Sequence, residues 1–256
     1  GQSLSAAEQT VPADRFIHSL HGYFLRPGDA AKPIVFTVDP IRDGRSFTTR
    51  RVVAVQDGRA IFSLSASFQI EEKGLAHQAE ILPEVPGPDG LLSERELGEE
   101  YLARLPEAVR ASVPAAMRER IVAERPIEIR PIDPIDPMKP EASEPTRRVW
   151  FRASGPLPDQ RSLHQYMLAY ASDFHLLAAT MQPHQVTWLT PNIQVASLDH
   201  AMWFHRAFRF DDWLLYDIEG PTAQAARGLA RGRWFTRDGV LVASTAQEGL
   251  IRDRRR

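Results

Sequence analysis

Two distant segments of the chain share one pattern, and this internal repeat constrains the fold more than any other feature. Segments 50–69 and 232–247 each contain a β-rich run, an Asp-Gly pair and a second run that ends in small residues and glutamine. The pairs are Asp57-Gly58 and Asp238-Gly239. Asp-Gly between two such runs is typical of a tight hairpin, because both residues tolerate positive φ angles. The repeat therefore predicts one hairpin in each half of the chain, and indicates a duplicated domain.

A second resemblance between the halves lies upstream of these hairpins. Ser19–Phe24 parallels Ser197–Phe204, with one or two residues of slippage. Each half is therefore expected to run from a helix into a long strand and then into the hairpin. We predict a first repeat over 1–82 and a second repeat over 146–256.

The segment 83–145 is predicted to link the repeats. Thirteen of the twenty prolines lie between Pro83 and Pro158. Ser93 and Glu96 have the spacing of a capping box, which indicates a helix running to about Leu105, and Pro106 is a good start for a second helix. The prolines of 126–140 exclude a central strand, because proline cannot donate to a sheet ladder. The linker should therefore contain two short helices and one edge strand.

The second half also contains a stretch that is almost free of charge. Between Ser162 and His205 the only formally charged residues are Asp173 and Asp199. The first part, 162–181, has apolar residues on nearly every face of a helix, which indicates a helix buried on all sides. A carboxylate in its middle must find hydrogen-bonding partners or become harder to ionise. Asp173 is therefore a candidate catalytic residue, although a cap for a broken helix or a pair with a core hydroxyl would also explain it.

Composition excludes several classes of function. The 256 residues are 43% hydrophobic and 25% charged with a net charge of −2, which is ordinary for a globular protein and disfavours binding to nucleic acid. The absence of cysteine excludes disulfides and thiolate chemistry. No apolar run is long enough to enter a membrane, and no P-loop, Rossmann, nucleophile-elbow or zinc-protease motif is present. We expect a cytoplasmic protein with no cofactor.

Two histidines of the charge-poor stretch are the candidate metal ligands. His200 and His205 are five residues apart, so on one strand they face opposite sides and do not converge. Asp199 and His200 also point apart, which weakens an acid–base pair. We therefore predict no metal site, and interpret these histidines as strand residues at a surface or a subunit interface.

In combination, motifs along almost the whole chain resemble the acyl-CoA thioesterase II (TesB-like) family. The motifs are Phe24–Gly28, Arg42–Phe47, Arg50–Val52, Ser65–Gln69, Tyr170–Asp173, Gln182–His184, Ser197–His205, Trp213–Tyr216, Ala226–Gly228 and Ala243–Gly249. This resemblance implies an α+β double hot-dog fold, in which two long helices are each wrapped by an antiparallel sheet. Family members have a strand and the start of a helix before the equivalent of Gly1, so the N-terminal strand is expected to be missing here.

The resemblance also implies a chemistry and a site. In the family an aspartate, a serine or threonine, and a glutamine orient a water that attacks the thioester carbonyl without an acyl-enzyme; the matching residues here are Asp173, Ser197 and Gln247. The implied substrate is an acyl-CoA, whose chain would lie in a tunnel lined by residues such as Leu168, Met202 and Trp203. We expect a homo-oligomer. Alternatives are a hydratase or dehydratase, which would need a histidine near Asp173, and a non-catalytic acyl-CoA binder.

Overall fold

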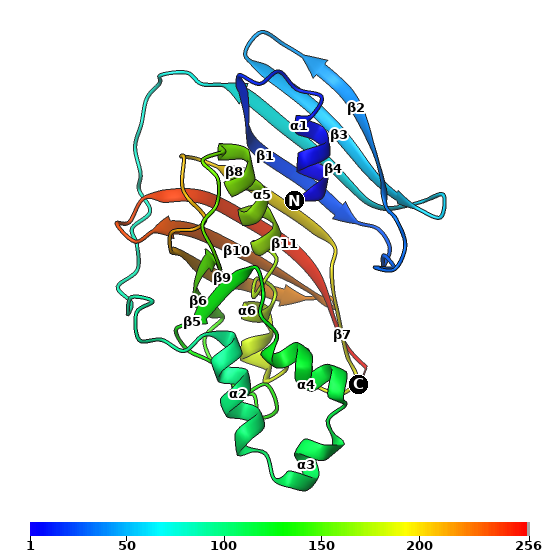
Figure 1. The fold of residues 1–256 in the computed structure, drawn as a ribbon, viewed down its shortest axis with the longest axis vertical. Coiled ribbons are helices and arrows are strands. Elements are labelled where there is room, and N and C mark those ends of the chain that lie inside the picture. Colours follow the sequence, from blue (N-terminus) through cyan, green and yellow to red (C-terminus); the bar gives the residue numbers. More distant parts are fainter. Residues whose placement is uncertain (255–256) are drawn as a thin grey trace.

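The computed structural model describes residues 1–254, which form one antiparallel sheet with helices on one face (Figure 1). Within these residues the strand order is β2-β3-β4-β1-β8-β11-β10-β9-β6-β5, and β7 also pairs with β11. The strands are β1 (Arg15–Phe24), β2 (Val35–Asp43), β3 (Phe47–Gln56), β4 (Arg59–Ile70), β5 (Ile127–Pro131), β6 (Thr146–Ala153), β7 (Ile193–Ser197), β8 (Asp199–Phe204), β9 (Leu214–Gln224), β10 (Arg227–Thr236) and β11 (Leu241–Asp253).

The sheet is internally repeated about the pairing of β1 with β8, where His21 lies opposite Ala201. Outward from this centre the order is β1-β4-β3-β2 in one direction and β8-β11-β10-β9 in the other. The second half continues into β6 and β5, whereas no strand among the described residues pairs with the outer side of β2. This arrangement has the duplication that the sequence predicts, and the first half lacks the counterpart of β6.

Both predicted hairpins are present, with turns of different geometry. In the β3–β4 turn, Asp57 and Gly58 both have positive φ angles, of 49° and 72°. In the β10–β11 turn the positive φ belongs to Gly239, at 87°. The Asp-Gly pairs therefore close hairpins in both halves, but only the first has the two positive φ angles expected of a type I′ turn.

Helices cover the inner face of the sheet and extend below one end of it (Figure 1). Helix α1 contacts both β3 and α5, and α5 contacts β1. One apolar core joins the halves, with Leu4, Phe68, Phe151 and Leu168 all at most 2% exposed. None of the helices in the described part of the chain is long and apolar enough to cross a membrane. The helices are α1 (Gln2–Glu8), α2 (Glu94–Arg104), α3 (Glu107–Ser112), α4 (Ala115–Val122), α5 (Arg161–Ala171), α6 (Ala178–Met181) and the 3-10 helix η1 (Gln182–His184).

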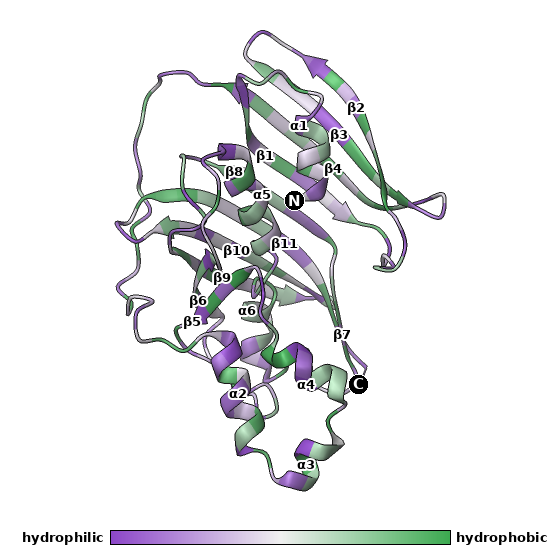
Figure 2. Cartoon of the chain, in the orientation of Figure 1, coloured by the Kyte–Doolittle hydropathy of each residue, from purple (hydrophilic) through white to green (hydrophobic). Residues whose placement is uncertain are grey.

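The predicted linker contains three helices rather than two. Ser93 and Glu96 form the expected capping box at the start of α2, and Pro106 precedes α3. Helices α2 and α4 bury none of their described residues, and Figure 2 shows many hydrophilic positions along α2. Strand β5 lies at the end of the strand order, as its prolines require.

The expectation of one long helix over 162–181, buried on every side, is wrong. Helix α5 ends at Ala171, turns follow, and α6 begins only at Ala178. Tyr170 is 51% exposed, so α5 has an open side. His175 has a φ of 66°, a left-handed conformation that interrupts the helical path. The break places Asp173 in a turn instead of inside a helix.

Candidate active site

The three residues singled out by the family resemblance lie within hydrogen-bond distance of one another. Asp173 follows α5, Ser197 ends β7 and Gln247 lies within β11. The Ser197 hydroxyl donates to Asp173 Oδ1 at 3.1 Å, and Gln247 Nε2 donates to the same oxygen at 2.7 Å. Gln247 Nε2 also donates to Ser197 Oγ at 3.0 Å. Two donors therefore hold one carboxylate oxygen in place.

The second carboxylate oxygen of Asp173 differs from the first. Among the described residues, Oδ2 has no hydrogen-bond partner, whereas Oδ1 has two. Asp173 as a residue is exposed, Ser197 is half-buried and Gln247 is only 1% exposed. The site is thus rigid on its inner side, and its free carboxylate oxygen is accessible to water and to a substrate.

This exposure corrects the sequence interpretation of Asp173. We expected a carboxylate buried in the middle of an apolar helix, but the helix ends two residues earlier. Burial is therefore not what distinguishes this aspartate. Its distinguishing feature is the pair of donors on Oδ1.

Buried polar contacts anchor the turn that carries Asp173. The Tyr216 hydroxyl donates to the Ser172 carbonyl at 2.9 Å and lies 2.8 Å from Thr245 Oγ1. Burial raises the pKa of Tyr216, so its hydroxyl remains a neutral donor. Gly232 makes room for the tyrosine, because a Cβ at that position would lie 2.2 Å from the Tyr216 ring. The residue before Asp173 is thereby fixed from the sheet below.

His200 is the functional neighbour that the sequence interpretation missed. We expected it at a surface or an interface, but it is 7% exposed and lies beneath the site. Its Nδ1 is 2.5 Å from Gln247 Oε1, and its Nε2 is 2.8 Å from Ser172 Oγ. Burial lowers the pKa of His200, which favours the neutral ring. The alternation of β8 contained the signal, because Met202 and Phe204 share its face of the strand.

The other histidines do not pair with Asp173 either. His175 Nε2 forms an ion pair with Glu94 at 2.9 Å, and His205 Nε2 lies 2.8 Å from Ser244 Oγ. The amide of Gln247 separates His200 from the carboxylate. The histidine–aspartate contact that a hydratase would need is therefore not found among the described residues.

A cavity of about 390 Å³ begins at the two residues after Asp173. Phe174, Met181 and Val186 contribute apolar side chains to it, while Arg125 and Arg147 contribute positive charge. The tunnel expected from the sequence is wrong in one respect, because the exposed Trp203 lies on the opposite side of β8 from the buried Met202. An apolar recess with cationic residues thus lies next to the site.

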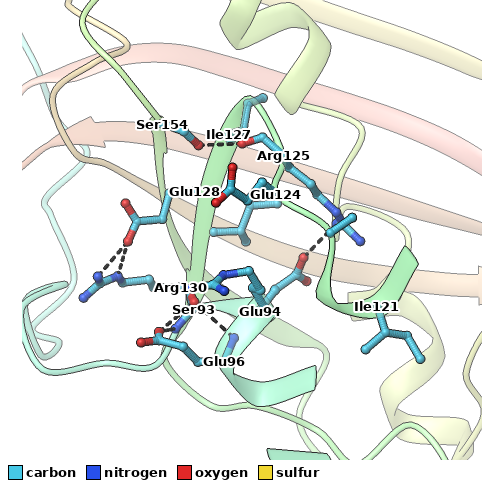
Figure 3. Close-up of a pocket in the computed structure, with 13 residues that line it drawn as sticks. Ser93, Glu94, Glu96, Ile121, Glu124, Arg125, Ile127, Glu128, Arg130 and Ser154 are labelled. Atoms are coloured by element: carbon cyan, nitrogen blue, oxygen red, sulfur yellow. Dashed lines mark hydrogen bonds and ion pairs between the residues drawn. The ribbon is translucent and has the colours of Figure 1, made fainter. Parts of the chain in front are cut away.

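A cavity of about 450 Å³ elsewhere has a different character. It lies between α2 and β5, and none of Asp173, Ser197 and Gln247 lines it. Figure 3 shows that its charged side chains bind one another, with Arg125 paired to Glu94 at 3.1 Å and Arg130 to Glu128 at 2.6 Å. This charge pairing leaves the cavity without an obvious ligand.

Comparison with known families decides the family. A model described as acyl-CoA thioesterase matches residues 116–250, and one described as the acyl-CoA thioesterase N-terminal domain matches residues 1–69. The chain belongs to the acyl-CoA thioesterase family. As a member of a family of thioester hydrolases it is an enzyme.

Individual members of the thioesterase family are similar over nearly the whole chain. Acyl-CoA thioesterase 2 of Haemophilus influenzae is 40% identical over 98% of this chain and 85% of that protein. The crystal structure of acyl-CoA thioesterase II TesB2 from Mycobacterium marinum is 44% identical, with a TM-score of 0.76, over 98% of this chain and 86% of that one. A hot-dog protein of Alicyclobacillus acidocaldarius shares the fold at 18% identity, with a TM-score of 0.73 over 98% of this chain and 84% of that one. The predicted α+β double hot-dog fold is confirmed.

Proposed function

We propose that this thioesterase hydrolyses acyl-CoA to a free fatty acid and CoA, using a water that Asp173, Ser197 and Gln247 orient. The observation that carries the proposal is the asymmetry of the Asp173 carboxylate. Its Oδ1 accepts hydrogen bonds from Ser197 and Gln247, while Oδ2 has no partner among the described residues. A carboxylate held in this way presents one oxygen to a water at a fixed angle.

The reaction would proceed in two steps. Asp173 Oδ2 removes a proton from the water as the water oxygen attacks the thioester carbonyl, which forms a tetrahedral intermediate. The C–S bond then breaks, the acid is released, and the thiolate of CoA takes up the proton. The Ser197 hydroxyl already donates to the carboxylate at 3.1 Å, so its role here is orientation and not covalent attack.

The surroundings of the site support an acyl-CoA substrate. Phe174 and Met181 line the cavity that begins beside Asp173, and they would contact an acyl chain. Arg125 and Arg147 line the same cavity and would attract the phosphates of CoA. No group of the described residues other than Asp173 combines a free carboxylate oxygen with both a serine and a glutamine donor.

A mixed panel of saturated, enoyl and hydroxyacyl thioesters of CoA tests this proposal. Hydrolysis predicts that free CoA thiol appears together with an equal amount of acid, and that mass spectrometry of the quenched enzyme detects no acyl adduct. A hydratase would convert the enoyl thioester without releasing thiol. A non-catalytic binder would change none of the thioesters.

We also propose that the protein self-associates in the cytoplasm. Trp203 and Tyr23 are 37% and 61% exposed on one face of the central strands, and such aromatic side chains are common at interfaces. Phe204 and Phe208 pack into the core and cannot contribute to that surface. Light scattering at micromolar concentration should give a multiple of the 28.8 kDa chain mass, and the mass of one chain would contradict self-association.

A further inference from the structure

Gln247 can support the site only if its amide faces the right way. Its Nε2 points to Asp173 and Ser197, and its Oε1 points to the ring of His200. A rotation of the amide by half a turn would place Oε1 against the carboxylate, where two acceptors repel each other. Some group on the inner side must therefore oppose that rotation.

His200 Nδ1 lies where such a group is needed. It is 2.5 Å from Gln247 Oε1, so Nδ1 must carry the hydrogen of that contact. The ring is neutral because burial lowers the pKa of His200, which leaves Nε2 as an acceptor. The Ser172 hydroxyl lies nearer to Nε2 (2.8 Å) than to the Ala169 carbonyl (3.1 Å), and supplies the matching donor. The surroundings of both nitrogens thus select one tautomer.

The first half of the molecule contains the same pair of strand positions without the histidine. There Phe16 lies opposite Gln69 in the pairing of β1 with β4. Gln69 is only half-buried, and its amide donates to Glu72 at 3.0 Å. A glutamine at this place in the repeat therefore does not need a buried histidine, and the histidine is found only in the half that contains Asp173.

We propose that His200 is a positioning residue for hydrolysis, which acts by donating from Nδ1 to Gln247 and so fixing the amide that holds Asp173 and Ser197. This proposal rests on the proposed function. His200 does not touch the substrate in this scheme, so its loss should lower kcat and leave KM nearly unchanged. Its effect should also vanish when Gln247 has no amide.

Two variants of similar shape separate the hydrogen bond from the packing. His200→Asn can present an amide nitrogen near the position of Nδ1, whereas His200→Leu presents only methyl groups. Both lose the contact with Ser172, so that contact cancels in the comparison. We expect kcat to fall by about tenfold to a hundredfold in His200→Leu, and by less than about fivefold in His200→Asn, which is the range seen for directly coupled residues.

The Gln247→Ala background provides the decisive comparison. If His200 acts through Gln247, adding His200→Leu to Gln247→Ala should lower kcat by less than about threefold further. Equal losses in the two backgrounds, or normal turnover of His200→Leu, would overturn the role of His200 while leaving the proposed function intact. A wild-type enzyme that releases no CoA thiol would overturn both.

The tautomer supplies a test that needs no variant and is unaffected by misfolding. NMR of the wild-type protein labelled with ¹⁵N histidine distinguishes the two ring nitrogens. The proposal predicts that His200 carries its proton on Nδ1 at neutral pH. A proton on Nε2 would overturn it, because Nδ1 could then not donate to Gln247.

Discussion

The two halves of the sheet are built alike, yet they surround the glutamine of their last hairpin strand differently. Gln69 on β4 lies opposite Phe16 and binds Glu72. Gln247 on β11 is almost fully buried and binds Asp173, Ser197 and His200. The same strand order thus supports a polar site in one half and an ordinary hairpin strand in the other.

The residues that follow the two helices differ in the same sense. Asp173 is the second residue after α5, and Thr10 is the second residue after α1. Thr10 accepts a hydrogen bond from Arg50 Nε at 2.9 Å through Oγ1, and another from Arg50 Nη2 at 2.9 Å through its carbonyl. Arg50 is 2% exposed and also binds Asp43 at 2.7 Å. Where the second half presents a carboxylate, the first half has a threonine clamped by a buried cation, which indicates a structural role.

Asp173→Asn should produce the largest effect and would break the comparison if it did not. Asparagine keeps an oxygen that can accept from Ser197 and Gln247, but it cannot remove a proton from water. We expect kcat for acyl-CoA hydrolysis to fall by about 10²–10⁴-fold, with little change in KM. The melting temperature should stay nearly constant, because Asp173 is exposed. A lower melting temperature with normal turnover would indicate a structural role instead.

Arg50→Met should affect stability and leave chemistry unchanged. It removes the donors that hold Thr10 and Asp43, and the carbonyl of Thr10 then loses its partner. We expect the free energy of unfolding to fall by about 1–3 kcal/mol, the usual range for a lost buried polar contact. Denaturant unfolding measures this loss, and turnover of the folded variant serves as the control. A tenfold loss of kcat would contradict a purely structural first half.

The pH dependence of stability should show a smaller effect from His200. Burial lowers its pKa most, the nearby Asp173 and Asp199 raise it, and the Gly1 amino group lowers it further. The folded state therefore keeps the ring neutral, while the unfolded chain binds a proton below its ordinary pKa of 6.5. Stability from this group is complete above pH 6.5 and is lost as the pH falls toward the folded pKa.

Melting temperatures between pH 7.5 and 5 test this contribution. The wild-type protein should lose more stability over that range than His200→Asn, which has no ring to protonate. His21→Asn is the matched control, because His21 is exposed on the same sheet. Parallel curves for the wild type and His200→Asn would contradict the prediction.

Local sequence patterns predicted the parts of the fold that depend on near neighbours. The Asp-Gly pairs specify hairpins because the turn requires positive φ, and Ser93 with Glu96 specifies the start of α2. The family resemblance selected Asp173, Ser197 and Gln247, which the structure brings into contact, while their catalytic role remains a proposal. The division at 82 and 145 also remains a proposal.

Long-range contacts explain what the sequence did not predict. Helix α5 ends where Tyr216, distant in sequence, captures the Ser172 carbonyl, and no local pattern announces that contact. The exposure of Asp173 follows from this early end. His200 could have been placed inward from the alternation of β8, but its partner Gln247 lies on another strand and only the pairing of β8 with β11 brings them together.

The relative loss of turnover in Gln247→Ala and Gln69→Ala tests the inequality of the two halves most directly. The two glutamines occupy corresponding strands, and each substitution removes the same group. Gln247→Ala removes one donor to Asp173 Oδ1, so we expect kcat to fall by about tenfold to a thousandfold, whereas Gln69→Ala should stay within about twofold of the wild type. Equal losses from the two substitutions would contradict the assignment of the site to the second half.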